Sequence, residues 1–318
     1  MIAAWMAASH RGRVSIMFQC EDMHHTIQQK LQRGENIGIS LKAVFFFLSF
    51  MIASDAALKS QELYVFSEPA SNMPSRALSA RYAGKFLQST MSGDWEHRQK
   101  LYASFGLDKR WMLRTGTTFS NMYSQPATRW ESVNIYAKYR FFSRDEVHRH
   151  FRMAAFMEAS YSQNDLMYDE VSLEGDQSGV QTGLVMTQLL HKLAISSTIG
   201  ITELLHWRRW DETHTAMHPY QAFNYSFSAG YLLFPRHYSS YRQTNLNLYL
   251  ELLGSRNLDR PGHYVDLAPA VQLILNSNTK INTGYRFQLA GNMFRMAQNS
   301  LLISVETTFL NVLKRKSS

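Results

Sequence analysis

Charged side chains recur at alternate positions within apolar or aromatic stretches of this chain. Alternation assigns eight cations and four acids to one face: Arg81, Lys85, Arg114, Lys138, Arg140, Arg152, Glu158, Glu251, Asp266, Lys280, Arg286 and Glu306. Such groups cannot face lipid cheaply, so they must line water or pair with one another. The excess of cations predicts a surface that favours anions. The alternative is a set of salt-bridged side chains that only maintain the shape of the protein.

Other chemistry is weaker in this sequence. His206, His214 and His218 gather in one segment, and the spacing of the last two suits a metal on a helix, but Pro219 opposes that helix, so no metal site is predicted. A hydrolase would need a Ser and a His two residues apart on a strand. His237 and Ser239 have this spacing in a predicted tight turn. An outer-membrane lipid hydrolase is therefore the least favoured alternative, and we predict no enzyme.

Cofactors and nucleic acid are not expected as partners. The sequence contains no glycine-rich phosphate loop or nucleotide fingerprint, so no cofactor is predicted. The net charge of +8 comes without a basic cluster, which argues against nucleic acid. The single cysteine, Cys20, excludes a disulfide framework.

The alternating stretches predict β-strands, because successive side chains of a strand point to opposite faces. In residues 280–289, for example, Ile281, Thr283 and Tyr285 alternate with Lys280, Asn282 and Gly284. Twelve strands are expected: 77–88, 99–107, 110–121, 131–143, 150–162, 178–190, 192–205, 220–234, 242–254, 263–276, 279–291 and 297–312.

The connections between these strands alternate between short and long. This order predicts an up-and-down antiparallel barrel with tight turns at one rim and long loops at the other. Twelve strands enclose too wide a space for a dry core, and their length suits a tilted bilayer crossing. We therefore predict an all-β transmembrane barrel in the bacterial outer membrane, in contact with its lipids. A soluble β-sandwich is the structural alternative.

The N-terminal region predicts export. Residues 43–54 form one apolar run, preceded by Lys42 and followed by small residues, which is the order of a secretory signal peptide. We expect residues 1–56 to be this signal with an over-extended start. Residues 57–76 should be a periplasmic lead-in, residues 77–313 the barrel and residues 314–318 a basic tail.

The export signal, the residues Glu62-Leu-Tyr-Val-Phe-Ser-Glu-Pro-Ala-Ser-Asn-Met-Pro and the alternating strands together carry a resemblance. The chain resembles a porin-like group of outer-membrane β-barrel proteins from bacteroidete-type Gram-negative bacteria. That resemblance implies location and fold far more than activity.

The expected function is a passive channel for small polar or anionic solutes, and a closed structural barrel is the alternative. Strands begin about twenty residues after the signal, so no N-terminal plug domain of the kind that active outer-membrane importers carry is expected. Gly179, Gly183, Gly230 and Gly284 are expected to leave space beside the wall. Replacing Arg140 and Arg152 with Glu should reverse the ion preference.

Overall fold

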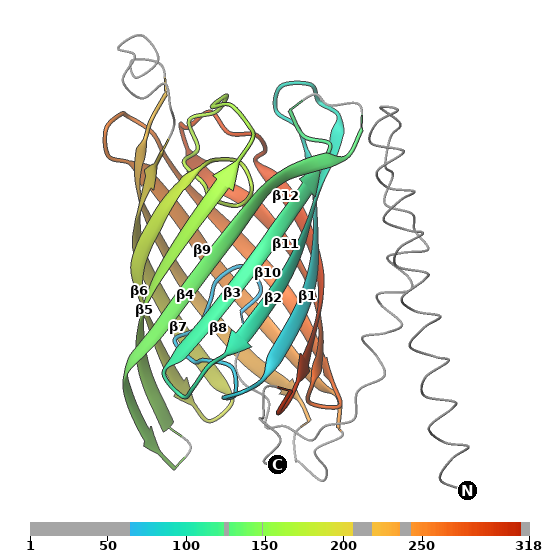
Figure 1. Cartoon of the computed structure of the whole chain (residues 1–318), viewed down its shortest axis with the longest axis vertical. Helices are drawn as coiled ribbons and strands as arrows, with labels where there is room; N and C mark the ends of the chain where they lie inside the picture. Colours follow the sequence, from blue (N-terminus) through green and yellow to red (C-terminus); the bar gives the residue numbers. More distant parts are fainter. Residues whose placement is uncertain (1–63, 124–126, 148, 206–217, 236–242, 313–318) are drawn as a thin grey trace, which may run out of the picture.

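The computed structural model describes residues 64–123, 127–147, 149–205, 218–235 and 243–312. These residues form a closed antiparallel barrel in which sequential strands are neighbours and β1 pairs with β12 (Figure 1). The strands are β1 (Leu78–Gln88), β2 (Trp95–Gly106), β3 (Trp111–Ser120), β4 (Arg129–Glu146), β5 (Arg149–Ser162), β6 (Gly179–Leu190), β7 (Leu193–Leu204), β8 (Gln221–Phe234), β9 (Asn245–Asn257), β10 (His263–Leu275), β11 (Thr279–Gly291) and β12 (Asn299–Phe309). The predicted twelve-stranded up-and-down barrel is confirmed.

The strand bounds differ from the predicted ones by four residues at most. Connection length, however, does not alternate strictly. The β8–β9 connection covers residues 235–244 and the β9–β10 connection only 258–262, because β9 begins and ends three residues later than expected. The alternation of rims follows from the up-and-down topology itself, whatever the length of each connection.

The two faces of the sheet are opposite in character to those of a soluble barrel. In β9, which lies between β8 and β10, the Leu248 and Leu250 side chains are 43% and 51% exposed. The Glu251 side chain of the same strand is fully buried. Val133 and Ile135 of β4 are exposed in the same way, and Lys138 is buried. Apolar side chains therefore face outward and polar ones face the lumen, which is the arrangement of a barrel that spans a bilayer.

Two segments outside the strands lie inside this wall. The N-terminal segment (residues 64–77) precedes β1 and enters the barrel (Figure 1). The acidic connection (residues 163–178) joins β5 to β6 and folds inward from the rim of the long connections. Both contribute to the buried apolar clusters, so the interior is partly filled by chain that belongs to no strand.

Candidate functional site in the barrel lumen

The N-terminal segment is bound through its backbone. The buried Glu251 carboxylate accepts hydrogen bonds from the backbone N–H groups of Val65, Phe66 and Ser67 at 2.9, 2.9 and 2.8 Å. Farther along, Thr187 Oγ1 accepts a hydrogen bond from the Ala70 N–H at 2.8 Å. A carboxylate with several backbone N–H donors is a strong anchor, because charged hydrogen bonds are shorter and stronger than neutral ones.

Cations of the wall bind the middle of this segment. Lys138 Nζ donates hydrogen bonds to the carbonyl oxygens of Pro69 and Ser71 at 2.8 and 2.9 Å. The same ammonium lies 3.7 Å from the Glu68 carboxylate, which also forms an ion pair with Arg114. Lys138 is fully buried, so these partners must replace the water that its charge has lost.

This result differs from the expected lead-in. Residues 57–63 lie outside the described part of the chain, but residues 64–74 line the inside of the barrel, and Ser75 and Arg76 are exposed. The segment is also packed by apolar contacts, since Tyr64 and Val65 form one buried cluster with Tyr249 and Leu302. The segment therefore fills part of the lumen, although it is a short stretch of chain and not a plug domain.

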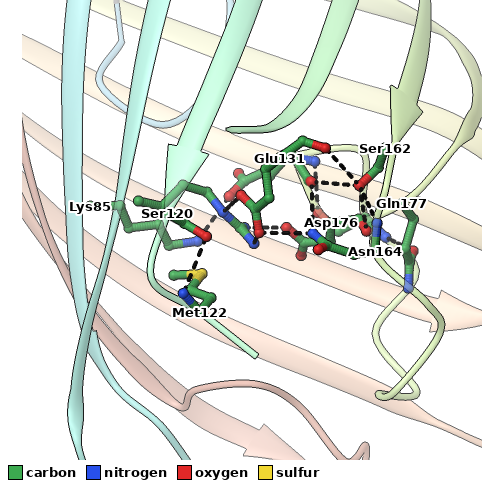
Figure 2. A network of polar contacts seen from close by, with 12 residues as sticks. Lys85, Ser120, Met122, Glu131, Ser162, Asn164, Asp176 and Gln177 are labelled. Atoms are coloured by element: carbon green, nitrogen blue, oxygen red, sulfur yellow. Dashed lines mark hydrogen bonds and ion pairs between the residues drawn. The ribbon is translucent and has the colours of Figure 1, made fainter. Parts of the chain in front are cut away.

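The acidic connection is bound nearer the rim from which it enters the lumen. Figure 2 shows the network that joins it to the wall. Arg98 donates two hydrogen bonds to Glu131, at 2.9 and 3.1 Å, and forms an ion pair with Asp176. Asn164 Nδ2 donates to Glu131 at 2.8 Å, and Ser162 Oγ donates to the carbonyl oxygens of Gly175 and Asp176 at 3.0 and 3.1 Å.

Two further acids of the connection reach wall cations. Glu174 lies 2.8 Å from Lys85 Nζ and 3.9 Å from Lys100 Nζ, and these ammonium groups hold the pKa of Glu174 well below its usual value. Glu170 lies 3.1 Å from Arg295 and 3.9 Å from Arg286. Burial opposes the ionisation of Glu170, but the two guanidinium groups lower its pKa overall.

Asp176 behaves differently from these two acids. Burial raises its pKa to about 6, because the loss of water and the nearby Glu131 carboxylate outweigh the attraction of Arg98. Of these three acids of the connection, Glu170 and Glu174 stay ionised and Asp176 titrates near neutrality.

A cavity of about 310 Å³ lies between the two inserted segments. Its wall carries five cations, Arg81, Lys85, Lys100, Arg114 and Arg286, but only one acid, Glu158. The other acids that line it are Glu68 of the N-terminal segment and Glu170 and Glu174 of the acidic connection. Four tyrosines, several hydroxyl groups and the amides of Gln181 and Asn224 also line it. The site can therefore hold water and anions.

The structure places the predicted lumen residues in three groups. Those that line this cavity are Arg81, Lys85, Arg114, Glu158 and Arg286. Lys138, Lys280 and Glu306 line a second cavity of about 60 Å³, which also touches Arg81 and Arg114. The rest bind inside the barrel or at its rim: Glu251 holds the N-terminal segment, Asp266 pairs with Arg286 and Arg295, Arg152 donates to Ser71 and Asp145, and Arg140 donates to the Lys109 carbonyl.

Sequence reasoning missed several residues of this site. Arg98 was missed because the predicted strand began at residue 99, and Lys100, on the same face of β2, was inside that strand but was not assigned to the lumen. Glu68, Glu170, Glu174, Asp176 and Arg295 were missed because they are not on strands. One available signal was the density of acids in residues 163–178, opposite a predicted surplus of lumen cations.

The glycines do not leave the expected space. A Cβ at Gly230 would lie 2.3 Å from the Tyr249 ring, and one at Gly284 would lie 2.6 Å from the Phe66 ring. Cβ atoms at Gly179 and Gly183 would meet the backbone oxygens of Glu203 and Ile199. At Gly230 and Gly284, then, the missing side chain is replaced by an aromatic ring that fills the lumen.

The alternative chemistries concern few described residues. Of the histidines considered as ligands, His206 and His214 lie outside the described residues, as do His237 and Ser239; His218 is described. Across the described ranges there is no group of three or more His, Cys, Asp or Glu placed to hold a metal ion. Nor does this part of the chain contain a helix long and apolar enough to cross a membrane.

Comparison with known proteins shows the fold alone. No protein-family model and no curated protein matches the sequence. An outer membrane channel from Pseudomonas putida F1 has a TM-score of 0.53 at 11% identity, over 77% of this chain and 100% of that one. The KdgM porin has a TM-score of 0.47 at 10% identity, over 73% of this chain and 99% of that one. For the NanC porin the TM-score is 0.46 at 12% identity, over 72% and 98%.

The class of protein follows from the closed barrel, its outward apolar face and this shared fold. The chain is a β-barrel protein of the bacterial outer membrane.

Proposed function

We propose that this barrel is a passive channel for small polar or anionic solutes, without energy coupling. The observation that supports it best is the charge of the residues around the 310 Å³ cavity: five cations against one acid on the strands, and five cations against four acids once the inserted segments are included. Fixed charges in a channel bounded by lipid strongly affect which ions pass, because the low-dielectric wall focuses their electric field into the water path. Small anions should therefore cross more readily than cations of the same size.

The test is single-channel recording of the purified protein in planar bilayers with a salt gradient. We expect discrete conductance steps and a reversal potential that shows anion preference. Arg140 and Arg152 do not line the 310 Å³ cavity, so replacing both with Glu should reduce that preference instead of reversing it as the sequence suggested. Absence of steps across several salts and voltages would contradict a channel.

A closed structural barrel is the second candidate, and the inserted segments favour it. Lys138, Arg98 and Glu251 bind the inserted segments through ion pairs and hydrogen bonds. Their charges are therefore paired inside the lumen, as in a barrel that is filled by its own side chains. The same recordings separate the two functions, because a closed barrel gives heat-modifiable, folded protein without conductance.

Two finer proposals remain from the sequence. Membership of the bacteroidete-type porin-like group is supported by residues 62–74 and the export signal. Lipid hydrolysis remains a third candidate, which an assay for fatty-acid release from vesicles would detect.

A further inference from the structure

The wall cations that meet the acidic connection lie on one continuous sector of the barrel. Arg286 is on β11, Lys85 on β1, and Arg98 and Lys100 on β2, and these strands are joined through β12. Lys85 and Arg98 are direct partners in the β1–β2 register. Like charges directly opposite one another are destabilising, so this sector requires anions close by.

The wall itself supplies only part of that negative charge. Glu131 of β4 pairs with Arg98, and Asp266 of β10 pairs with Arg286. Among the described residues, the ion pairs of Lys85 and Lys100 are both with Glu174, which belongs to the acidic connection. The counter-ion of these two lysines is therefore a group that the barrel strands do not provide.

Glu174 can leave the lysines without unfolding the connection. Its side chain is 46% exposed toward the cavity, whereas the Lys85 and Lys100 side chains are 18% and 12% exposed. The connection itself is held elsewhere, because Leu166, Val171 and Leu173 pack in a buried cluster with Leu204 and Tyr220. A rotation of one side chain would expose two ammonium groups to the cavity.

The geometry points to a binding site for small polycarboxylates at Lys85, Lys100 and Arg286, which Glu174 occupies as a tethered competitor. This inference rests on the proposed channel function and names its solute class. One carboxylate of the solute replaces that of Glu174 between the two lysines. A second one lies toward Arg286, which lines the same cavity. The volume of about 310 Å³ is within the range of small-molecule sites.

The carboxylate is preferred over other anions because the group now in place is a carboxylate. Its contact with Lys85, at 2.8 Å, is that of a charge-assisted hydrogen bond. An uncharged molecule of the same shape would leave the two ammonium groups without a counter-ion once Glu174 had moved. Charge, rather than size, should therefore decide binding.

The test is isothermal titration calorimetry of the full chain in detergent, with propane-1,2,3-tricarboxylate as the probe and its triamide as the matched uncharged control. Glu174→Gln removes the competitor, so it should bind the tricarboxylate about tenfold more tightly than the wild type, which corresponds to one charged contact. The double change Lys85→Gln and Lys100→Gln should abolish binding. Glu146→Gln removes an acid from the exposed end of β4, paired there with Arg144, and should change nothing.

Each outcome supports or overturns the inference. Unchanged or weaker binding to the Glu174→Gln variant, equal binding of the triamide, or an undiminished affinity of the lysine variant would refute it. Heat-modifiable mobility on gels verifies that each variant is folded. If the wild type conducts in bilayers but does not bind the tricarboxylate, the channel stands and this site fails. If the wild type binds the tricarboxylate but does not conduct, the binding site stands and the channel function fails.

Discussion

The Glu251 carboxylate shows how one residue can position a whole segment. It is fully buried, accepts three backbone N–H groups of the N-terminal segment and also accepts a hydrogen bond from Ser228 Oγ at 3.2 Å. A strand residue of this kind is conspicuous in the sequence as a charge among leucines, but its partner is not. Nothing in the alternation indicates that a backbone would bind there.

We expect Glu251→Gln to release residues 65–67 from the wall. The amide keeps one acceptor oxygen but turns an NH₂ donor toward backbone donors, and each charged hydrogen bond lost costs about 1.5–3 kcal/mol. Hydrogen exchange of the Val65, Phe66 and Ser67 amides should accelerate strongly. Thr187→Val is the control, because within the N-terminal segment its Oγ1 contacts the Ala70 N–H and none of the amides of residues 65–67; its other partner is Ser196 Oγ on the wall. Equal protection of residues 65–67 in the wild type and the Gln variant would exclude this anchoring role.

Asp176 gives the acidic connection a dependence on pH. Its pKa is about 6 in the folded protein against 3.8 ordinarily, so the docked connection binds more protons than the released one between these values. Docking is therefore strongest at low pH and weakens as pH rises through 6. Glu170 and Glu174 have lowered pKa values and add the opposite dependence only below their ordinary value of 4.5.

Between pH 5 and pH 7, proteolysis within residues 163–178 should become faster as pH rises. The Asp176→Asn variant should lose this increase. The Asn side chain cannot ionise, so the variant should behave the same at both ends of this window. The comparison uses a protease whose own activity is corrected with an unfolded substrate. A wild type whose cleavage slows as pH rises would show that the sign is wrong.

At the scale of elements, strands and inserted segments were unequally predictable. The strands could be found because period-two alternation is local, as in Leu246, Leu248 and Leu250 of β9. The N-terminal segment could not, because Pro69 and Pro74 only exclude regular structure and do not say where the chain goes. Its position depends on contacts with residues more than one hundred positions away, such as Glu251 and Thr187.

The glycines next to aromatic rings couple strands to the N-terminal segment. We expect Gly284→Ala to destabilise the protein by about 1–3 kcal/mol, because its Cβ would overlap the Phe66 ring. Removing the ring should relieve that cost. The double variant Phe66→Ala with Gly284→Ala should therefore be more stable than the sum of the two single changes predicts. Strict additivity in thermal unfolding experiments would mean that the two residues do not interact.

At the scale of the whole molecule, closure and facing were predictable together. A strand count of twelve and outward leucines leave a lipid-embedded closed barrel as the one arrangement without unpaired edges. Many charged positions of the strands were visible in the alternation, but their pairing was not. Glu174, Asp176 and Glu68, which pair with Lys85, Arg98 and Arg114, come from outside the strands. The surplus of cations on the wall is thus partly neutralised by chain that the barrel encloses.

The orientation of the barrel gives a last prediction. We expect the long connections to face outward from the cell and the short ones to face the periplasm, since outer-membrane barrels place short turns inside. Met91→Cys in the β1–β2 connection and Lys109→Cys in the β2–β3 turn put one thiol on each rim, and both residues are exposed. A membrane-impermeant maleimide should label the first in intact cells and the second only after the outer membrane is opened. Protease added to intact cells should likewise leave residues 276–279 of the β10–β11 turn uncut. Labelling at position 109 in intact cells, with position 91 protected, would invert the topology and require solutes to meet the N-terminal segment before the acidic connection.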